Sequence, residues 1–269
     1  MLLIPLRQFR CRSSKIHSIL ELLQRNCRKG MSNKEISRAL EIPSSTCYRI
    51  LAALKKYDYV CQRRPGMRYY LGYAHLRLAD SVIEGMDEAA ISLPYLEELH
   101  QKTEETTFFA RLSGELCIAM EMCGHINTRI SVGRGEVMPF YCSAAGMAML
   151  AFMGEKERGR IIKNLTFKAF TEYTVTDLDK LEMRLAEIYE CGVAYNLQEF
   201  HNGINAMATP IFDRQNKIVG TLAIVGTSVD LDRGQLEEYS RLFLQAGSDI
   251  SGVLGGKYPE RLLKEGKNG

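Results

Sequence analysis

The sequence predicts an α+β protein built from two modules, and three observations lead to this fold class. Charge is unequally distributed, because residues 1–80 contain 16 Lys and Arg against 5 Asp and Glu, a net charge of +11, whereas residues 81–269 have a net charge of −8. Three short helical patterns and a hairpin pattern fill the basic segment. The acidic segment mixes strand and helix patterns without the regular alternation of a βαβ repeat. We therefore expect the first module to bind a polyanion, with a solvated basic face as the alternative.

Composition and length place the chain among globular proteins. Its 269 residues, 46% hydrophobic and 25% charged, suffice for one large domain or two ordinary ones. The opening MLLIPLRQF is too short for a signal-peptide core, and no apolar run reaches the length of a membrane span. The eight cysteines have no regular spacing, and no glycine-rich phosphate loop occurs. We expect reduced thiols, a cytoplasmic location, no membrane contact and no cofactor.

The first module begins after an unassigned arm at residues 1–13. Apolar residues at helical spacing predict an amphipathic helix from Ser14 to about Arg25. Ser32 stands three residues before Glu35, which is the capping-box pattern at the start of a short second helix. After a proline, a third helix is expected to begin at Ser44.

The third helix has two distinct faces. Its inward face is apolar and consists of Cys47, Ile50, Leu51 and Leu54. Its opposite face is polar, basic and small, and consists of Ser45, Arg49, Ala52 and Lys56, with Thr46 and Tyr48 beside it. We expect one of the hydroxyls at its start to cap the helix and the others to lie where DNA phosphates would meet its N-terminus.

Two short helices joined by a tight turn predict a helix-turn-helix, and the following hairpin predicts a wing. Strands at 57–62 and 68–71 would flank a Pro-Gly turn that is crowded by arginines. Residues 14–72 would thus form a winged helix-turn-helix domain, with Arg49 as the candidate for reading a guanine base. The predicted DNA-binding residues are Ser44, Ser45, Thr46, Tyr48, Arg49, Lys56, Arg63, Arg64 and Arg68.

The second module is expected at residues 89–256, between a linker helix at 73–88 and a C-terminal tail at 257–269. Its helical patterns lie at 89–102, 143–153, 155–164, 177–191 and 233–254. Its strand patterns lie at 106–112, 115–122, 129–132, 193–195, 206–212 and 218–225.

Several blocks in the same order resemble the IclR family of bacterial transcriptional regulators, from about Ser14 to about Gly255. IPSSTCYRIL at 42–51 is similar to the family's LPxSTxYRLL, and PFYCSAAGMAMLA at 139–151 is similar to PLHATAxGKAxLA. Residues 175–200 and 203–213 match further blocks. The resemblance implies a double-stranded DNA operator, a GAF/profilin-like domain with an antiparallel sheet that binds a small effector, and a homodimer or homotetramer.

The start of the helix at 143 is the expected effector site. Ser143, Ala144 and Ala145 combine small side chains with unpaired backbone N–H groups, which suit a carboxylate. Close packing of the helix on the sheet would explain the same residues, and only the resemblance favours binding.

The site also departs from the family pattern. The family often places an Asp, a Cys and two Ser opposite this helix, and by alignment the corresponding residues are Asn196, Ala206, Ala223 and Val225. The usual His and Lys are replaced by Tyr141 and Met147. A small keto acid would lose most of its hydrogen bonds in such a site. We therefore expect a larger or less polar effector, with one carboxylate and an aromatic or alkyl body, lined in addition by Met138, Phe140 and Met207.

Three other classes of function compete with this interpretation. An enzyme is disfavoured because Ser143 lacks the G-x-S-x-G context, although five scattered histidines could still meet in space. A metal site at Cys117, Cys123 and His125 lacks paired C-x2-C spacing. A winged helix that binds only proteins would not need the basic surface of Arg49, Lys56 and the wing arginines.

Overall fold

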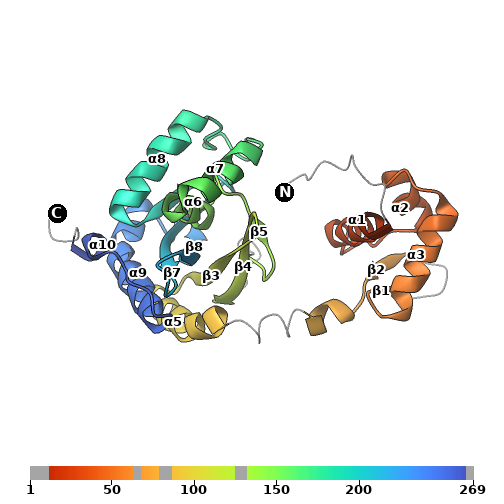
Figure 1. Ribbon diagram of the computed structural model, residues 1–269, viewed down its shortest axis with the longest axis horizontal. Helices are drawn as coiled ribbons and strands as arrows, with labels where there is room; N and C mark the ends of the chain where they lie inside the picture. The colour runs from red at the N-terminus through yellow and green to blue at the C-terminus, as the bar shows by residue number, and fades with distance from the viewer. Residues whose placement is uncertain (1–11, 63–67, 79–86, 125–131, 265–269) are drawn as a thin grey trace. The chain divides into compact units, whose positions relative to one another are not determined.

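The computed structural model describes residues 12–62, 68–78, 87–124 and 132–264 (Figure 1). The chain divides into two compact units, an N-terminal unit that ends at Gly85 and a C-terminal unit that begins at Met86. Within the described residues, no helix is both long enough and apolar enough to cross a membrane.

In the N-terminal unit, the described residues up to Leu71 form three helices and a two-stranded antiparallel hairpin, as predicted. The elements are α1 (Arg12–Arg25), α2 (Asn33–Ala39), α3 (Ser44–Lys56), β1 (Val60–Gln62) and β2 (Tyr69–Leu71). The capping box at the start of α2 is confirmed, because Ser32 Oγ accepts from Glu35 N and Glu35 Oε2 accepts from Ser32 N at 2.7 Å. Both strands are shorter than the patterns predicted, and the turn at residues 63–67 lies outside the described residues.

A small core holds this unit together. The predicted inward face of α3 is buried there, against apolar side chains of α1, α2 and the hairpin. The hairpin is also fixed to the segment before α2, since Met31 and Tyr69 exchange both backbone hydrogen bonds, at 3.0 and 2.7 Å. Gly30 has φ +62°, and a Cβ there would lie 2.6 Å from the Tyr70 ring, so only glycine fits.

The linker is described in part. Of the predicted linker helix at 73–88, residues 74–78 are helical, residues 79–86 lie outside the described residues, and residues 87 and 88 already belong to the next helix. The chain is next described at α5 (Asp87–Thr103), which begins two residues earlier than predicted.

The C-terminal unit is built on one six-stranded antiparallel sheet with the order β5-β4-β3-β8-β7-β6. Its strands are β3 (Thr106–Ser113), β4 (Leu116–Cys123), β5 (Val137–Met138), β6 (Ala194–Leu197), β7 (Ile204–Phe212) and β8 (Ile218–Thr227). Its further helices are α6 (Ala144–Phe152), α7 (Glu155–Asn164), α8 (Leu178–Cys191), α9 (Arg233–Val253) and α10 (Glu260–Lys264). These elements confirm the predicted α+β class.

Two short elements were not predicted, and one predicted strand is largely untested. Of the predicted strand at 129–132, residues 129–131 lie outside the described residues, and Val132 lies in no strand. The unpredicted edge strand β5 has two residues, which pair with Cys117 and Ile118 of β4. Neither β5 nor the five-residue α10 is long enough to produce a periodic pattern.

Helices cover both faces of the sheet. Helices α6, α7 and α8 lie over one face, and α5 and α9 lie over the other (Figure 1). We call the two apolar layers the α6-side core and the α9-side core. Neighbouring residues of β3 contribute to different layers, because Phe108 belongs to the α6-side core and Phe109 to the α9-side core. A hydrogen bond joins β3 to α5, because the Thr107 hydroxyl donates to Leu96 O at 2.8 Å.

Candidate DNA-binding surface and effector pocket

The outward face of α3 is exposed as predicted. Ser45, Arg49, Ala52 and Lys56 are exposed, Tyr48 is 58% exposed, and Thr46 is half-buried. Basic and hydroxyl groups on one exposed helix face can bind phosphates and base edges in a DNA groove.

The prediction that a hydroxyl caps α3 is wrong. The N-cap residue is Pro43, which provides no side-chain hydrogen bond. Ser44 stands one position too late to cap, inside the helix, and its Oγ instead accepts from Asn33 Nδ2 of α2 at 2.8 Å. The first amides of α3 therefore have no side-chain cap and are left for another acceptor, such as a phosphate.

Arg68 is bound within the N-terminal unit. Its Nη2 lies 2.7 and 2.8 Å from the two carboxylate oxygens of Glu35, and its Nε donates to Gly30 O at 3.1 Å. Hydrogen bonds from Ser32, and then the Arg68 guanidinium, lower the pKa of Glu35. The position of Arg68 thus ties the wing to the start of α2. Arg63 and Arg64 lie outside the described residues.

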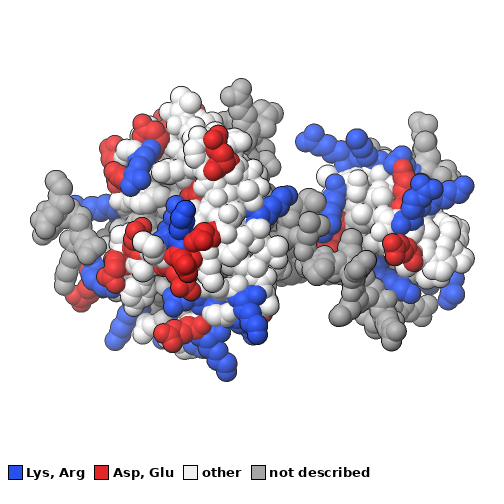
Figure 2. Space-filling model, turned by 90° about the horizontal axis from the view of Figure 1, so that it is seen from above, with Lys and Arg blue, Asp and Glu red and all other residues white. Residues whose placement is uncertain are grey.

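Further cations lie on the N-terminal unit. Figure 2 shows this smaller part of the molecule with more blue than red, whereas the larger part mixes the two. The exposed cations of the described residues that the sequence interpretation counted but did not assign are Arg28, Lys29, Lys34, Arg38, Lys55 and Arg77.

A cavity of about 470 Å³ opens at the N-terminus of α6. Seven of the predicted effector residues line it, namely Met138, Ser143, Ala144, Ala145, Asn196, Ala206 and Val225. The other three do not. Phe140 and Ala223 are buried in the α6-side core, and Met207 faces the α9-side core. Ala223 and Val225 lie on the same face of β8, two residues apart, and only Val225 reaches the cavity.

Seven wall residues were missed by the sequence interpretation. They are Phe108, Val132, Glu136, Phe200, His201, Asn202 and Ile204. Most lie in the segments before β5 and between β6 and β7. One feature of the sequence could have indicated His201 and Asn202, namely that they lie between the two family-matching blocks at 175–200 and 203–213.

The start of α6 presents free donors to this cavity. Ser143 is the N-cap residue, and its Oγ accepts from Gly146 N at 3.1 Å and donates to Pro139 O at 2.6 Å. The amides of Ala144 and Ala145 make no hydrogen bond with any part of the chain that the structure describes. Such amides, aided by the helix dipole, can bind an anion.

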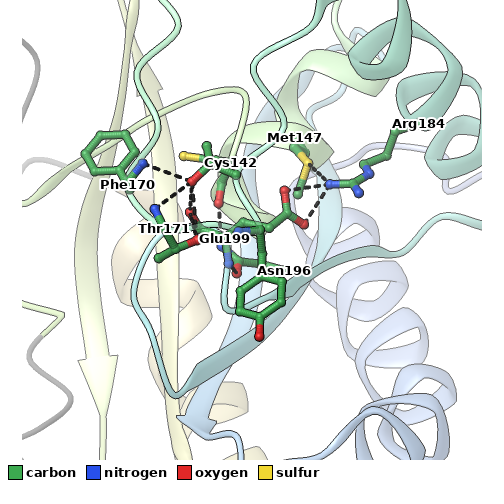
Figure 3. A network of polar contacts seen from close by, with 9 residues as sticks. Cys142, Met147, Phe170, Thr171, Arg184, Asn196 and Glu199 are labelled. Carbon is green, nitrogen blue, oxygen red and sulfur yellow. Dashed lines mark hydrogen bonds and ion pairs between the residues drawn. The ribbon is translucent and has the colours of Figure 1, made fainter.

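A polar network holds the cavity wall in place (Figure 3). Asn196 Nδ2 donates to Cys142 O, and Asn196 Oδ1 accepts from Glu199 N at 3.0 Å. The buried Glu199 carboxylate accepts from Arg184 Nη1 of α8 at 2.6 and 2.7 Å. Burial raises the pKa of Glu199, and Arg184 opposes that rise. Asn196 therefore fixes the segment before α6 to the β6–β7 connection, and only one of its N–H groups is left for a ligand.

Two titratable side chains lie among the wall residues. Glu136 Oε2 accepts from Gly133 N at 2.9 Å. His201 is an exposed residue, and its ring lies against the Phe200 ring with centroids 4.1 Å apart. Partial burial of the ring lowers the pKa of His201, and Glu136 acts in the opposite direction.

Metal-binding side chains do not cluster in the described parts of the chain, where no group of three or more His, Cys, Asp or Glu is placed to hold an ion. Of the candidate ligands, Cys117 is fully buried, which raises the pKa of its thiol, and His125 lies outside the described residues.

The architecture of a winged helix-turn-helix unit joined to an α+β unit with a cavity is that of a transcriptional regulator, and the comparisons agree. The family model "Bacterial transcriptional regulator IclR C-terminal" matches residues 80–252, and "Winged helix-turn-helix DNA-binding" matches residues 12–60. The chain belongs to the IclR family. It is a DNA-binding transcriptional regulator and not an enzyme.

Individual relatives match over most of their length. The chain is 25% identical over 226 residues to the HTH-type transcriptional regulator XynR of Escherichia coli, covering 84% of this chain and 89% of XynR. It is 28% identical over 245 residues to the HTH-type transcriptional repressor AllR of Salmonella paratyphi A, covering 90% and 89%. A solved IclR-type regulator from Alicyclobacillus acidocaldarius is 26% identical with a TM-score of 0.77, covering 91% of this chain and 98% of that one.

Proposed function

We propose that this protein is a cytoplasmic repressor or activator whose affinity for a double-stranded operator is set by a carboxylate-bearing metabolite. The cavity at the start of α6 carries this proposal, because it joins two unpaired amides to largely apolar walls. A homodimer or homotetramer would place recognition helices in successive major grooves. The effector would act by binding one arrangement of the oligomer more tightly than another.

The proposed effector is larger or less polar than a two-carbon acid. A volume of about 470 Å³ lies within the range of cavities that enclose drug-sized ligands. Ala206 and Val225 offer no hydrogen bonds on the wall, and Asn196 has only one N–H to spare. Glyoxylate or pyruvate would thus exchange its hydration for few protein contacts.

Calorimetric titration of the full chain tests the effector class. We expect hexanoate or 3-phenylpropionate to bind at least about tenfold more tightly than pyruvate, a difference of about 1.4 kcal/mol, because their bodies cover the apolar walls. Ala206→Leu should weaken this binding by filling the cavity, whereas Ala186→Leu on the exposed surface of α8 should not. Tight binding of glyoxylate or pyruvate would contradict the proposal.

Arg49 is proposed to read a base, and its removal should reveal that role. Arg49→Ala is expected to weaken binding to a specific duplex by about 1–3 kcal/mol and to relax preference at one base pair. The measurement is fluorescence anisotropy with a duplex from upstream of the protein's own coding region and with single-position variants of it.

Lys56→Ala provides the matched control for this experiment. Lys56 lies on the same exposed face of α3 and is proposed to contact phosphate, so its loss should weaken all sequences alike and reduce the salt dependence. If Arg49→Ala also weakens every duplex equally, Arg49 contacts phosphate and reads no base.

A further inference from the structure

Glu136 is the one acidic side chain among the described residues that line the cavity, and the chain holds it firmly. Its backbone is attached to β4, because Ala119 N donates to Glu136 O at 2.9 Å and Gly135 N donates to Ala119 O at 2.7 Å. The hydrogen bond from Gly133 N fixes one carboxylate oxygen, Oε2. The fixed backbone and side chain hold the carboxylate at the wall beside β5.

A fixed carboxylate has a consequence for the ligand that the cavity can accept. A ligand with only a carboxylate would bind the α6 amides but would be repelled by the carboxylate of Glu136, which lines the same cavity. A ligand with a hydrogen-bond donor at its other end would turn this repulsion into attraction, most strongly if the donor is charged.

His201 lines the same cavity as Glu136 and is a second titratable group in its wall. Partial burial lowers the pKa of His201, which favours the neutral ring, and a neutral imidazole carries one acceptor nitrogen and one N–H donor. Glu136 and His201 are close enough to influence each other electrostatically. Glu136 therefore presents acceptor oxygens to the cavity, and His201 adds one acceptor nitrogen beside one N–H, whereas the start of α6 presents donors only.

We propose that the effector is a bifunctional acid, with a carboxylate that binds the amides of Ala144 and Ala145 and an amine or hydroxyl that donates to Glu136. This inference rests on the proposed carboxylate-binding function of the same cavity. It assigns Glu136 as the residue that selects ligands with a distal donor over plain carboxylic acids of equal length.

Four probes of matched length test the proposal by calorimetry on the full chain: 6-aminohexanoate, 6-hydroxyhexanoate, hexanoate and hexylamine. We expect 6-aminohexanoate to bind the wild-type protein at least about tenfold more tightly than hexanoate, with 6-hydroxyhexanoate between them. In Glu136→Gln this preference should fall to about threefold or less, and hexanoate should bind no more weakly than before. The exposed Glu157→Gln on α7 is the matched control and should keep the wild-type ratio.

The outcomes distinguish failure of the carboxylate site at α6 from failure of the proposed role of Glu136. If hexanoate binds and 6-aminohexanoate gains nothing, or if Glu136→Gln leaves the ratio unchanged, the role of Glu136 is refuted while the carboxylate site stands. If hexylamine binds as tightly as 6-aminohexanoate and Glu136→Gln weakens both, the carboxylate site fails and the donor site stands. If none of the four binds the wild-type protein, both proposals fail. Thermal unfolding of each variant verifies that it is folded.

Discussion

Replacing Arg184 by methionine should lower the free energy of unfolding of the C-terminal unit by about 3 kcal/mol at neutral pH. The change leaves the buried carboxylate of Glu199 without its cation, and methionine keeps much of the side-chain volume. The value lies at the low end for a broken buried ion pair, because the Arg184 side chain is 33% exposed. Denaturant unfolding measures it. Arg160→Met, which breaks an exposed ion pair with Glu115, should cost at most about 1 kcal/mol.

The deficit of the Arg184 variant should also depend on pH. Burial already raises the pKa of Glu199 above its ordinary value of 4.5, and loss of Arg184 removes the main opposing effect. A carboxyl whose pKa is raised by folding costs stability progressively as the pH rises from the unfolded pKa to the folded one. The difference between Arg184→Met and wild type should therefore shrink at pH 5 relative to pH 7.5. An equal deficit at both pH values would mean that lost packing, not charge, is responsible.

Two glycine-to-alanine substitutions within helices should have opposite effects on stability. A Cβ at Gly146 in α6 would lie 2.6 Å from Phe140 Cα and from Pro139 O, so the helix would have to move away from backbone. Gly146→Ala should cost about 1–3 kcal/mol by overpacking and should weaken carboxylate binding at the displaced amides. Gly159→Ala in α7 meets nothing within 4 Å and should add about 0.5–1 kcal/mol.

Thermal unfolding of the two glycine variants provides the measurement, and calorimetry with a carboxylate probe provides the second readout. If Gly146→Ala changes neither the thermal stability nor the binding of the carboxylate probe, residues 139–143 can move enough to accommodate an added methyl group. The close approach of α6 to that segment would then not be what positions the amides.

The local sequence patterns predicted the longer helices well, because in α1, α3, α8 and α9 thirteen or more residues repeat their apolar positions along one face. Capping was less predictable. Ser and Thr at the start of α3 are residue types that commonly occupy the N-cap position. In the structure Pro43 occupies that position, and the Ser44 hydroxyl accepts a hydrogen bond from Asn33. A shift of one residue along the helix is enough to change the role of a side chain, and composition does not resolve such a shift.

The cavity was predictable at the start of α6 and, through the alignment with the family, at Asn196, Ala206 and Val225 on the sheet. Ser143, Ala144 and Ala145 are contiguous and matched a family block, so the sequence alone pointed to them. Phe108 and Glu136 reach the same space because β3 and β4 pair with each other and β5 pairs with β4. Such long-range register determines which residues meet, and no short window of sequence records it.

The alternation of Phe108 and Phe109 along β3 connects the two faces of the sheet mechanically. Planar peptide units join consecutive residues, so rotating the strand about its own axis moves both side chains at once. A ligand that forces Phe108 away from the cavity would apply a torque to β3, and Phe109 would shift in the layer beneath α5. Thr107 bonds this strand directly to α5, which follows the linker in the chain. The central strand would then convert ligand size on one face into a displacement of the linker-proximal helix on the other.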